Sequence, residues 1–149
     1  MVKHFKFARN HLYGGTKGLT LIELTIVLAI LAIIAAILIP SFLTTMERAR
    51  LRGDIQSARI IQNALDLYRA ERGHSVGGAD MEAKLLNLTA AGFVDARYTD
   101  IQTDGAAWVV DPVMGVVVHI GGITGNDRLH RVAASLPAEE RRFVTGISE

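Results

Sequence analysis

Residues 17–42 read KGLTLIELTIVLAILAIIAAILIPSF, and this stretch decides how the rest of the chain is organised. From Leu19 to Ile39 it offers 21 positions, of which the only polar ones are Thr20, Glu23 and Thr25. A helix needs about 20 mostly apolar residues, each rising about 1.5 Å, to cross a bilayer. The stretch therefore predicts a membrane-spanning helix.

A cleaved secretory signal is the main alternative for the same stretch. Such a signal has an apolar core of about 7 to 15 residues, and a small-x-small cleavage site follows the core. Here the apolar core is longer, and Pro40, Ser41 and Phe42 come directly after it. The sequence therefore favours a retained helix.

A basic leader precedes the apolar stretch. Residues 1–18, MVKHFKFARNHLYGGTKG, contain four cations, no acid and several closing glycines, which suits a processed leader better than a folded element. Four more cations follow the stretch within about 20 residues, so the flanking charges leave the orientation of the helix open. These downstream cations are Arg48, Arg50, Arg52 and Arg59.

The remaining composition limits the classes of function. A chain of 149 residues allows one modest domain besides a terminal segment. The net charge is +1, and the part after the leader has 12 basic and 15 acidic residues, a net charge of −3 that predicts no basic face for nucleic acid. The absence of cysteine excludes disulfides, thiolate metal sites and a cysteine nucleophile.

Helical periodicity resumes beyond Pro40. Apolar residues recur at steps of three and four from Ile55 to Tyr68, and Gly73 stands at the position after the last helical residue, Arg72. Proline lacks an amide hydrogen and crowds the preceding turn, so Pro40 predicts a bend where hydrocarbon gives way to water. We expect one long helix with a spanning part, residues 19–41, and an amphipathic part, residues 42–73.

Residues 74–149 predict a small α+β head. Asp80 is the expected N-cap of a short helix that Gly92 stops, with Leu85, Leu86 and Leu88 facing inward. Strands rich in β-branched residues predict a hairpin around the loop DPVMG, with Trp108 in its first strand. The expected helices are Met81–Ala91, Asn126–Leu136 and a turn within Pro137–Phe143, and the expected strands are Ala106–Val110, Val116–Ile120 and a candidate third strand, Tyr98–Gln102.

Glu23 is the only acid within the apolar stretch. A charge well inside a bilayer costs about 2.5 to 3.5 kcal/mol on insertion scales, so the carboxylate needs a compensating partner, unless it lies at headgroup depth in an ordinary anchor. If a peptidase cuts after Gly18, Leu19 gains a free amine, which is positively charged under most conditions. Glu23 can then pair with the amine of a neighbouring chain and set the axial register of an apolar filament core.

The conjunction of Gly18, Leu19, Glu23, the apolar run and Pro40 resembles the N-terminal signature of type IV pilins and type II secretion pseudopilins. This resemblance covers roughly the first 55 residues. It implies that Gly18 precedes the cleavage made by prepilin peptidase, that Leu19 becomes the N-methylated first residue, that Glu23 sets the register of assembly and that Pro40 kinks the helix. The implied fold is a long transmembrane and amphipathic helix packed on a small antiparallel sheet with short helices.

The chain also departs from the family pattern. Leu19 stands where the family usually has Phe, and Ala32 stands where it often has Gly. Since Gly in a helix costs about 1 kcal/mol relative to Ala, any local melting during assembly should centre nearer Pro40. The segments NALDLYRAERG, LLNLTAAGF and DPVMG are similar to the major pseudopilin layout, without the usual Tyr-Pro after Gly73. Secretion pseudopilin, competence pseudopilin and cysteine-free pilin all stay open.

The resemblance implies a location and partners. The precursor would cross the bacterial cytoplasmic membrane once, with its head outside the cytoplasm, and would then enter a periplasmic or surface filament that serves secretion, DNA uptake, or adhesion and motility. The implied partners are related pilin subunits, prepilin peptidase, an assembly platform protein with its ATPase, and membrane lipid. The alternative is a monomeric anchored enzyme or binding module, with a convergent polar pocket and an N-terminus near Met1.

Other patterns predict neither catalysis nor a cofactor. The histidines lack metal-site spacing, GGITG at Gly121–Gly125 lacks the context of a phosphate loop, and no nucleophile elbow is present. Asp100, Asp104 and Asp111 are candidate calcium ligands, but they lack the dense alternating oxygens of a calcium loop, so a solvated loop is favoured. The histidines are His4, His11, His74, His119 and His130.

Three arginines after the apolar stretch have more than one interpretation. Arg48, Arg50 and Arg52 can contact anionic headgroups or pair with acids of neighbouring subunits such as Glu47 and Asp54. A solvated face is the simplest interpretation.

Overall fold

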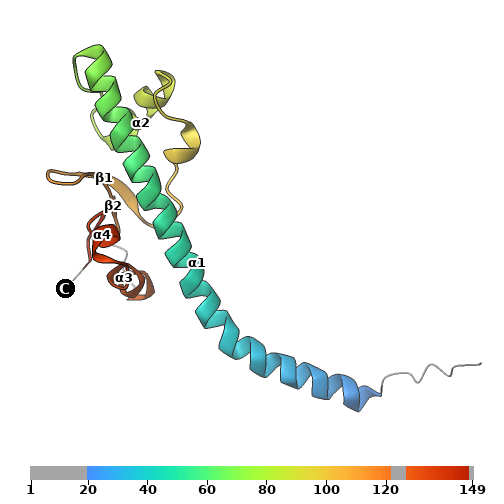
Figure 1. Ribbon diagram of the computed structural model, residues 1–149. Helices are drawn as coiled ribbons and strands as arrows, with labels where there is room; N and C mark the ends of the chain where they lie inside the picture. The colour runs from blue at the N-terminus through green and yellow to red at the C-terminus, as the bar shows by residue number, and fades with distance from the viewer. Residues whose placement is uncertain (1–19, 122–126, 148–149) are drawn as a thin grey trace, which may run out of the picture. The chain divides into compact units, whose positions relative to one another are not determined.

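The computed structural model describes residues 20–121 and 127–147. The chain divides into two compact units: a first unit, Met1–Ile37, and a second unit, Leu38–Glu149. Helix α1, Leu21–Arg72, is continuous over 52 residues and contains Pro40 (Figure 1). The predicted long helix is confirmed, and the bend expected at Pro40 stays a prediction.

The described part of the first unit is helical from Leu21 onward, and all its side chains are exposed. This follows from the sequence, because a helix that is apolar on every face has no polar side to turn to water and must be covered by lipid or by other protein. Its large exposed apolar side chains are Leu21, Ile22, Leu24, Ile26, Val27, Leu28, Ile30, Leu31, Ile33, Ile34 and Ile37.

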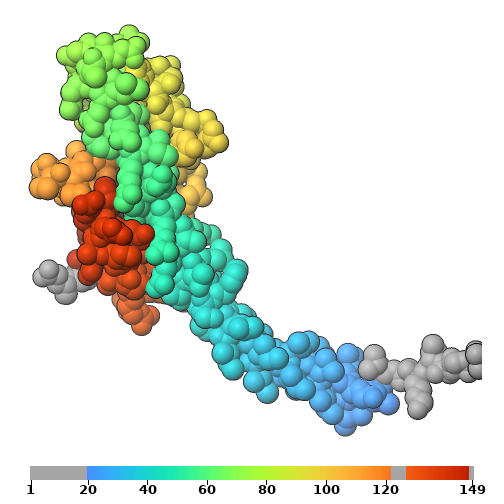
Figure 2. Space-filling model, viewed as in Figure 1, coloured from blue at the N-terminus to red at the C-terminus, as the bar shows by residue number. Residues whose placement is uncertain are grey.

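In the second unit, one face of α1 is buried by the rest of the chain. The buried residues of this face recur at the three- and four-residue steps of a helical stripe. They are Leu51, Asp54, Ile55, Ala58, Ile61 and Ala64. Figure 2 shows the C-terminal segment packed beside the middle of α1. The other elements are α2 (Met81–Ala90), η1 (Ala96–Tyr98), β1 (Ala107–Asp111), β2 (Gly115–His119), α3 (Asp127–Ala134), α4 (Ala138–Arg141) and β3 (Val144–Thr145).

Two apolar clusters follow each other along α1. The first joins Leu51 and Ile55 to strand β2, helix α3 and strand β3. The second joins Ala58, Ile61 and Ala64 to helix α2 and to the start of β2. Trp108 packs against both clusters, and its indole Nε1 donates a hydrogen bond of 2.8 Å to the carbonyl of Thr99. The amphipathic stripe therefore packs on the sheet and the short helices, as predicted.

The predicted helices and the hairpin are confirmed. Asp80 caps α2 by accepting a hydrogen bond of 2.8 Å from the Ala83 amide, and β1 pairs antiparallel with β2. One inward-facing leucine was predicted wrongly: Leu85 and Leu88 are buried, but Leu86 is 70% exposed. Leu86 lies about 100° around the helix from Leu85, outside the apolar cluster that Leu85 and Leu88 join.

The third strand was also predicted wrongly. It is β3, which pairs parallel with β2, so the sheet is mixed rather than antiparallel and has the order β1-β2-β3. Tyr98, the first residue of the predicted strand Tyr98–Gln102, is instead the last residue of the 3-10 helix η1. The amides of Gln102 and of the following Thr103 each donate to the carboxylate of Asp54, so they are not available to a neighbouring strand.

Gly115, at the start of β2, packs against α1 in a way that only glycine allows. Its φ is +80°, and an added Cβ would collide with the side chain of Gln62, whose Oε1 accepts a hydrogen bond of 3.0 Å from the Val116 amide. We therefore expect Gly115→Ala to lower the free energy of unfolding by about 2 kcal/mol, through backbone strain and loss of this hydrogen bond. Urea unfolding of the full-length chain in detergent micelles measures the change.

Gly53 provides the matched control for this substitution. It lies inside α1, and nothing stands within 4 Å of the position of an added Cβ. Because alanine is a better helix former, Gly53→Ala is expected to raise the free energy of unfolding by about 0.5 to 1 kcal/mol. Equal shifts of the same sign in both variants would contradict the packing described for Gly115.

Candidate functional site: the apolar helix and its polar flanks

The start of α1 is a capping box made by Thr20 and Glu23. The Glu23 Oε2 atom accepts hydrogen bonds of 2.9 Å from both the backbone amide and the hydroxyl of Thr20. In return, the Thr20 hydroxyl accepts a hydrogen bond of 3.2 Å from the Glu23 amide. Such a reciprocal pair satisfies amide donors that the first turn of a helix leaves without partners.

The capping box changes the interpretation of the acid. The sequence interpretation placed the Glu23 carboxylate in the apolar stretch without a partner in its own chain, and it missed Thr20. A threonine followed three residues later by a glutamate, directly before an apolar run, is the pattern that reveals such a box. Both residues follow Leu19, so a cut after Gly18 leaves the box intact.

The predicted processing site lies outside the described residues. Gly18 and Leu19 both precede Thr20, where the described structure begins. Cleavage between them, methylation of Leu19, the register role of Glu23 and the kink at Pro40 therefore stay predictions. Of the four predicted site residues, the structure describes Glu23, inside the first turn of α1, and Pro40, inside the same helix.

Among the described residues, α1 is the one helix long and apolar enough by its length and composition to cross a membrane. Eleven large apolar side chains of the first unit are exposed. Full burial of such a side chain contributes about 1.5 to 3 kcal/mol, so covering them all is favourable by at least roughly 15 kcal/mol. This surface therefore requires lipid or other protein.

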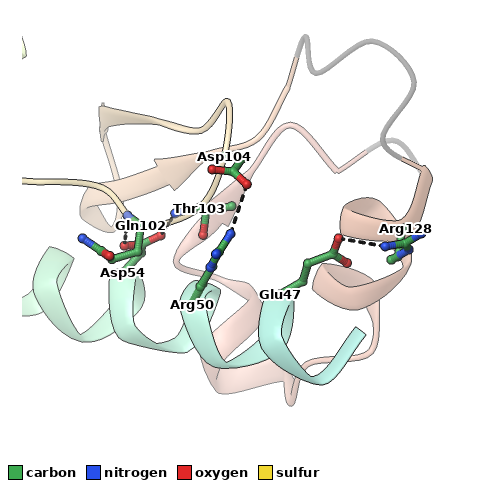
Figure 3. A network of polar contacts seen from close by, with 7 residues as sticks. All are labelled: Glu47, Arg50, Asp54, Gln102, Thr103, Asp104 and Arg128. Carbon is green, nitrogen blue, oxygen red and sulfur yellow. Dashed lines mark hydrogen bonds and ion pairs between the residues drawn. The ribbon is translucent and has the colours of Figure 1, made fainter. Parts of the chain in front are cut away.

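Beyond the apolar stretch, charged residues of α1 attach the helix to its own head (Figure 3). The Asp54 side chain is fully buried and accepts hydrogen bonds of 2.8 Å from the amides of Gln102 and Thr103. Arg50 pairs with Asp104 at 3.0 Å. Both contacts hold the segment before β1 against α1.

Further contacts attach the C-terminal helices to α1. Glu47 pairs with Arg128 at 3.5 Å, and Arg52 pairs with Glu140 at 3.0 Å. Arg48 donates a hydrogen bond of 2.8 Å to the Ser135 hydroxyl. Exposed pairs of this kind contribute about 0 to 1 kcal/mol each, so they orient the helices more than they stabilise them.

These contacts add to the interpretations of the three arginines. All three are exposed, as a solvated face requires, and all three also contact the chain's own head. Asp54 is fully buried in its own chain, so it is not accessible to an arginine of a neighbouring subunit. Sequence reasoning missed the structural role of Asp54, because its partners are 48 and 49 residues away along the chain.

The candidate calcium ligands have other contacts. Asp104 pairs with Arg50, and Asp111 accepts hydrogen bonds of 2.8 Å from the amides of Val113 and Met114 in the hairpin loop. Within residues 20–121 and 127–147, no group of three or more histidine and acidic side chains is placed to hold a metal ion. The structure does not bring the three aspartates together as a site.

In the head, hydrogen bonds lower the pKa of one capping carboxylate, that of Asp95. Asp95 caps η1, and its carboxylate accepts a backbone hydrogen bond of 3.0 Å from Arg97. This backbone bond, together with the Arg97 side-chain bond, lowers the pKa of Asp95. The charged form is therefore favoured in the fold, and the contact weakens as pH falls through the lowered pKa.

Comparison with known proteins finds a family motif in the N-terminal segment and two relatives that match part of the chain. The family described as the prokaryotic N-terminal methylation motif matches residues 15–39. Prepilin peptidase-dependent protein A of Clostridium perfringens is 41% identical over 54 residues, 36% of this chain and 39% of that relative. Type II secretion system core protein G of Escherichia coli is 28% identical over 58 residues, 39% of this chain and 40% of that relative.

The chain spans about two fifths of the length of each of these relatives. No solved structure matches the chain significantly. Within the matched part, the motif covers the Gly18–Leu19 junction, the capping box and the apolar stretch up to Ile39. The chain therefore carries an N-terminal methylation motif that includes the apolar first part of α1.

Proposed function

We propose that this chain is a pilin-like subunit of a type IV filament. It is made as a precursor, cut after Gly18, methylated at Leu19, anchored in a membrane by α1 and polymerised through the same helix. The single observation that carries the proposal is the methylation motif over residues 15–39, which includes the first part of α1, residues 21–37, where all the apolar side chains are exposed. An ordinary membrane anchor needs the apolar helix but not the motif.

Two successive environments explain the exposed apolar surface. In the membrane, lipid covers the helix, and in the filament, helices of other copies replace the lipid. Because lipid tails and apolar side chains are similar solvents, this exchange costs little hydrophobic free energy, and specific contacts must then direct assembly. The apolar side chains of the helix provide the contact area between subunits, and the charged residue among them selects how the subunits are arranged.

We assign the selection of this arrangement to Glu23. Its Oε2 atom receives both hydrogen bonds from Thr20, while the second carboxylate oxygen and the net charge are suited to the positive amine of a neighbouring Leu19. A buried charge left without its partner is strongly unfavourable, whereas the matched pair is tolerated. Only the stagger that brings acid and amine together is then stable.

The wider setting follows from the same proposal. The head lies outside the cytoplasm, prepilin peptidase processes the leader, and a platform protein with its ATPase drives polymerisation of identical or related subunits. The role is structural and needs neither catalysis nor a cofactor. Similarity to a type II secretion core protein supports a secretion filament as the first candidate, and filaments for DNA uptake or for adhesion and motility share the same assembly chemistry.

Mass spectrometry of the mature protein tests this function. When the chain is produced together with a prepilin peptidase, we expect a mass that corresponds to residues 19–149 plus one methyl group. Gly18→Val should block the cut, because it replaces the small residue before the junction. Gly14→Val lies outside the matched motif and should be processed normally. An intact mass beginning at Met1 beside an active peptidase would remove the proposal.

A further inference from the structure

A cationic groove lies between α1 and α3, next to the end of the apolar stretch. Its volume is about 470 Å³, within the range of about 300 to 1,000 Å³ common for ligand sites. All of its lining residues belong to the second unit. They are Pro40, Thr44, Arg48, Arg128, Arg131, Val132 and Ser135.

Three arginines give the groove its charge. Arg128 is partly neutralised by Glu47, at 3.5 Å, and Arg48 donates to a neutral hydroxyl, that of Ser135. Arg131 is exposed and, within the described parts of the chain, forms no ion pair. The three guanidinium groups and Glu47 together leave a net charge of about +2 at the groove. Such a site favours an anion with several oxygens, because each guanidinium can donate two parallel hydrogen bonds.

The position of the groove along α1 points to the membrane surface. If the hydrocarbon layer ends near Ile39, Thr44 and Arg48 follow it by roughly 8 and 14 Å along the helix axis. The headgroup layer on each side of a bilayer is about 5 to 8 Å thick. Helical side chains tilt toward the N-terminus, which brings the Arg48 side chain back toward Pro40, with which it lines the groove.

The neighbouring surface of the same helix is suited to acyl chains. Leu38, Ile39 and Phe42 are 57%, 56% and 63% exposed. With Ser41 and Thr45 they line a second, mainly apolar groove on α1. The cationic groove and the apolar groove therefore both lie on residues 38–48 of α1, about three turns of helix. This arrangement matches an amphipathic molecule better than a free anion.

From this we propose that the groove binds the phosphate of an anionic phospholipid while α1 lies in the membrane. Arg48 and Arg131 contact the phosphate oxygens, and Arg128 stays positioned by Glu47. The site gives the membrane-held subunit a fixed depth and holds α3 close to the bilayer surface. The inference rests on the membrane anchoring in the proposed function and not on polymerisation.

Native mass spectrometry of the full-length chain in detergent micelles tests the site. Phosphatidylglycerol and phosphatidylcholine with the same acyl chains are titrated, and the bound lipid is counted. We expect phosphatidylglycerol to bind more tightly. Arg48→Gln/Arg131→Gln should weaken that binding about 25-fold, near fivefold for each arginine, and leave phosphatidylcholine binding unchanged. Arg128 is kept, because its loss would leave Glu47 without its partner.

The matched control removes the same charge elsewhere. Arg69 and Arg141 do not line the groove, so Arg69→Gln/Arg141→Gln should change phosphatidylglycerol binding less than twofold.

Equal losses in the two double variants would overturn the proposal, as would displacement of the lipid by millimolar inorganic phosphate. The proposal would also be overturned if Arg48→Gln/Arg131→Gln bound lipid normally but no longer polymerised, because the groove would then serve contacts between subunits. Selective lipid binding by a chain that is never cleaved would support the site and remove the filament function.

Discussion

Replacing Asp54 by alanine is expected to lower the free energy of unfolding of the second unit by about 3 to 5 kcal/mol. The Asp54 side chain is fully buried, and its two oxygens accept hydrogen bonds of 2.8 Å from the amides of Gln102 and Thr103 (Figure 3). Hydrogen bonds to a charged group contribute about 1.5 to 3 kcal/mol each, and alanine would leave both amides without an acceptor. A domain of this size has about 5 to 15 kcal/mol in total, so much of its stability would be lost.

Urea unfolding of the full-length chain in detergent micelles measures this loss. Trp108 is the only tryptophan and packs against both apolar clusters, so its fluorescence reports on the second unit. Glu71→Ala is the control, because Glu71 is an exposed acid on the same helix, and its loss should cost less than about 0.5 kcal/mol. Asp54→Asn should recover only part of the loss, since its amide group replaces one acceptor by a donor. Equal effects of Asp54→Ala and Glu71→Ala would contradict the anchoring role.

The parts of the fold that depend on local pattern could be predicted from the sequence. The periodicity from Ile55 to Tyr68 predicts the buried face of α1, and β-branched residues around a turn predict the hairpin. Strand β3 has two residues, too few to show an alternation. The role of Asp54 depends on partners about 50 residues away, and no sequence spacing encodes such a contact.

The candidate site also has parts that local sequence pattern predicts and a part that depends on the folded chain. The junction at Gly18 and Leu19, the apolar stretch and Glu23 form a local pattern inside residues 15–39, the part of the chain that the methylation-motif family matches. The capping box of Thr20 and Glu23 is also local, since its residues are three apart, and the spacing could have revealed it. The cationic groove could not be predicted, because α3 reaches α1 only through the folded head.

Replacing Glu23 by glutamine is expected to reduce polymerisation at least about tenfold while cleavage continues. Glutamine can still accept a hydrogen bond from the Thr20 amide, so the capping box and the helix start are preserved. Only the negative charge is lost, and a neighbouring Leu19 amine would then be buried without a counter-ion. Breaking a buried pair on one side costs about 3 to 5 kcal/mol, more than enough for a tenfold change.

Thr20→Ala is the matched variant for this test. It removes the hydroxyl that bonds to Glu23 Oε2 and accepts from the Glu23 amide, but it keeps the charge. Loss of an N-cap costs about 0.5 to 2 kcal/mol of helix stability, confined to the first turn. If Glu23 acts through its charge, Thr20→Ala should polymerise within about twofold of the unmodified chain. The two variants thus separate assembly from capping.

The most direct measurement is the fraction of processed subunit that sediments as polymer, compared between Glu23→Gln and Thr20→Ala in cells that assemble the unmodified chain. Our account predicts that Glu23→Gln is cleaved but stays in the membrane, while Thr20→Ala sediments like the unmodified protein. Normal sedimentation of Glu23→Gln, or an equal loss in Thr20→Ala, would contradict the claim that the charge of Glu23 directs assembly.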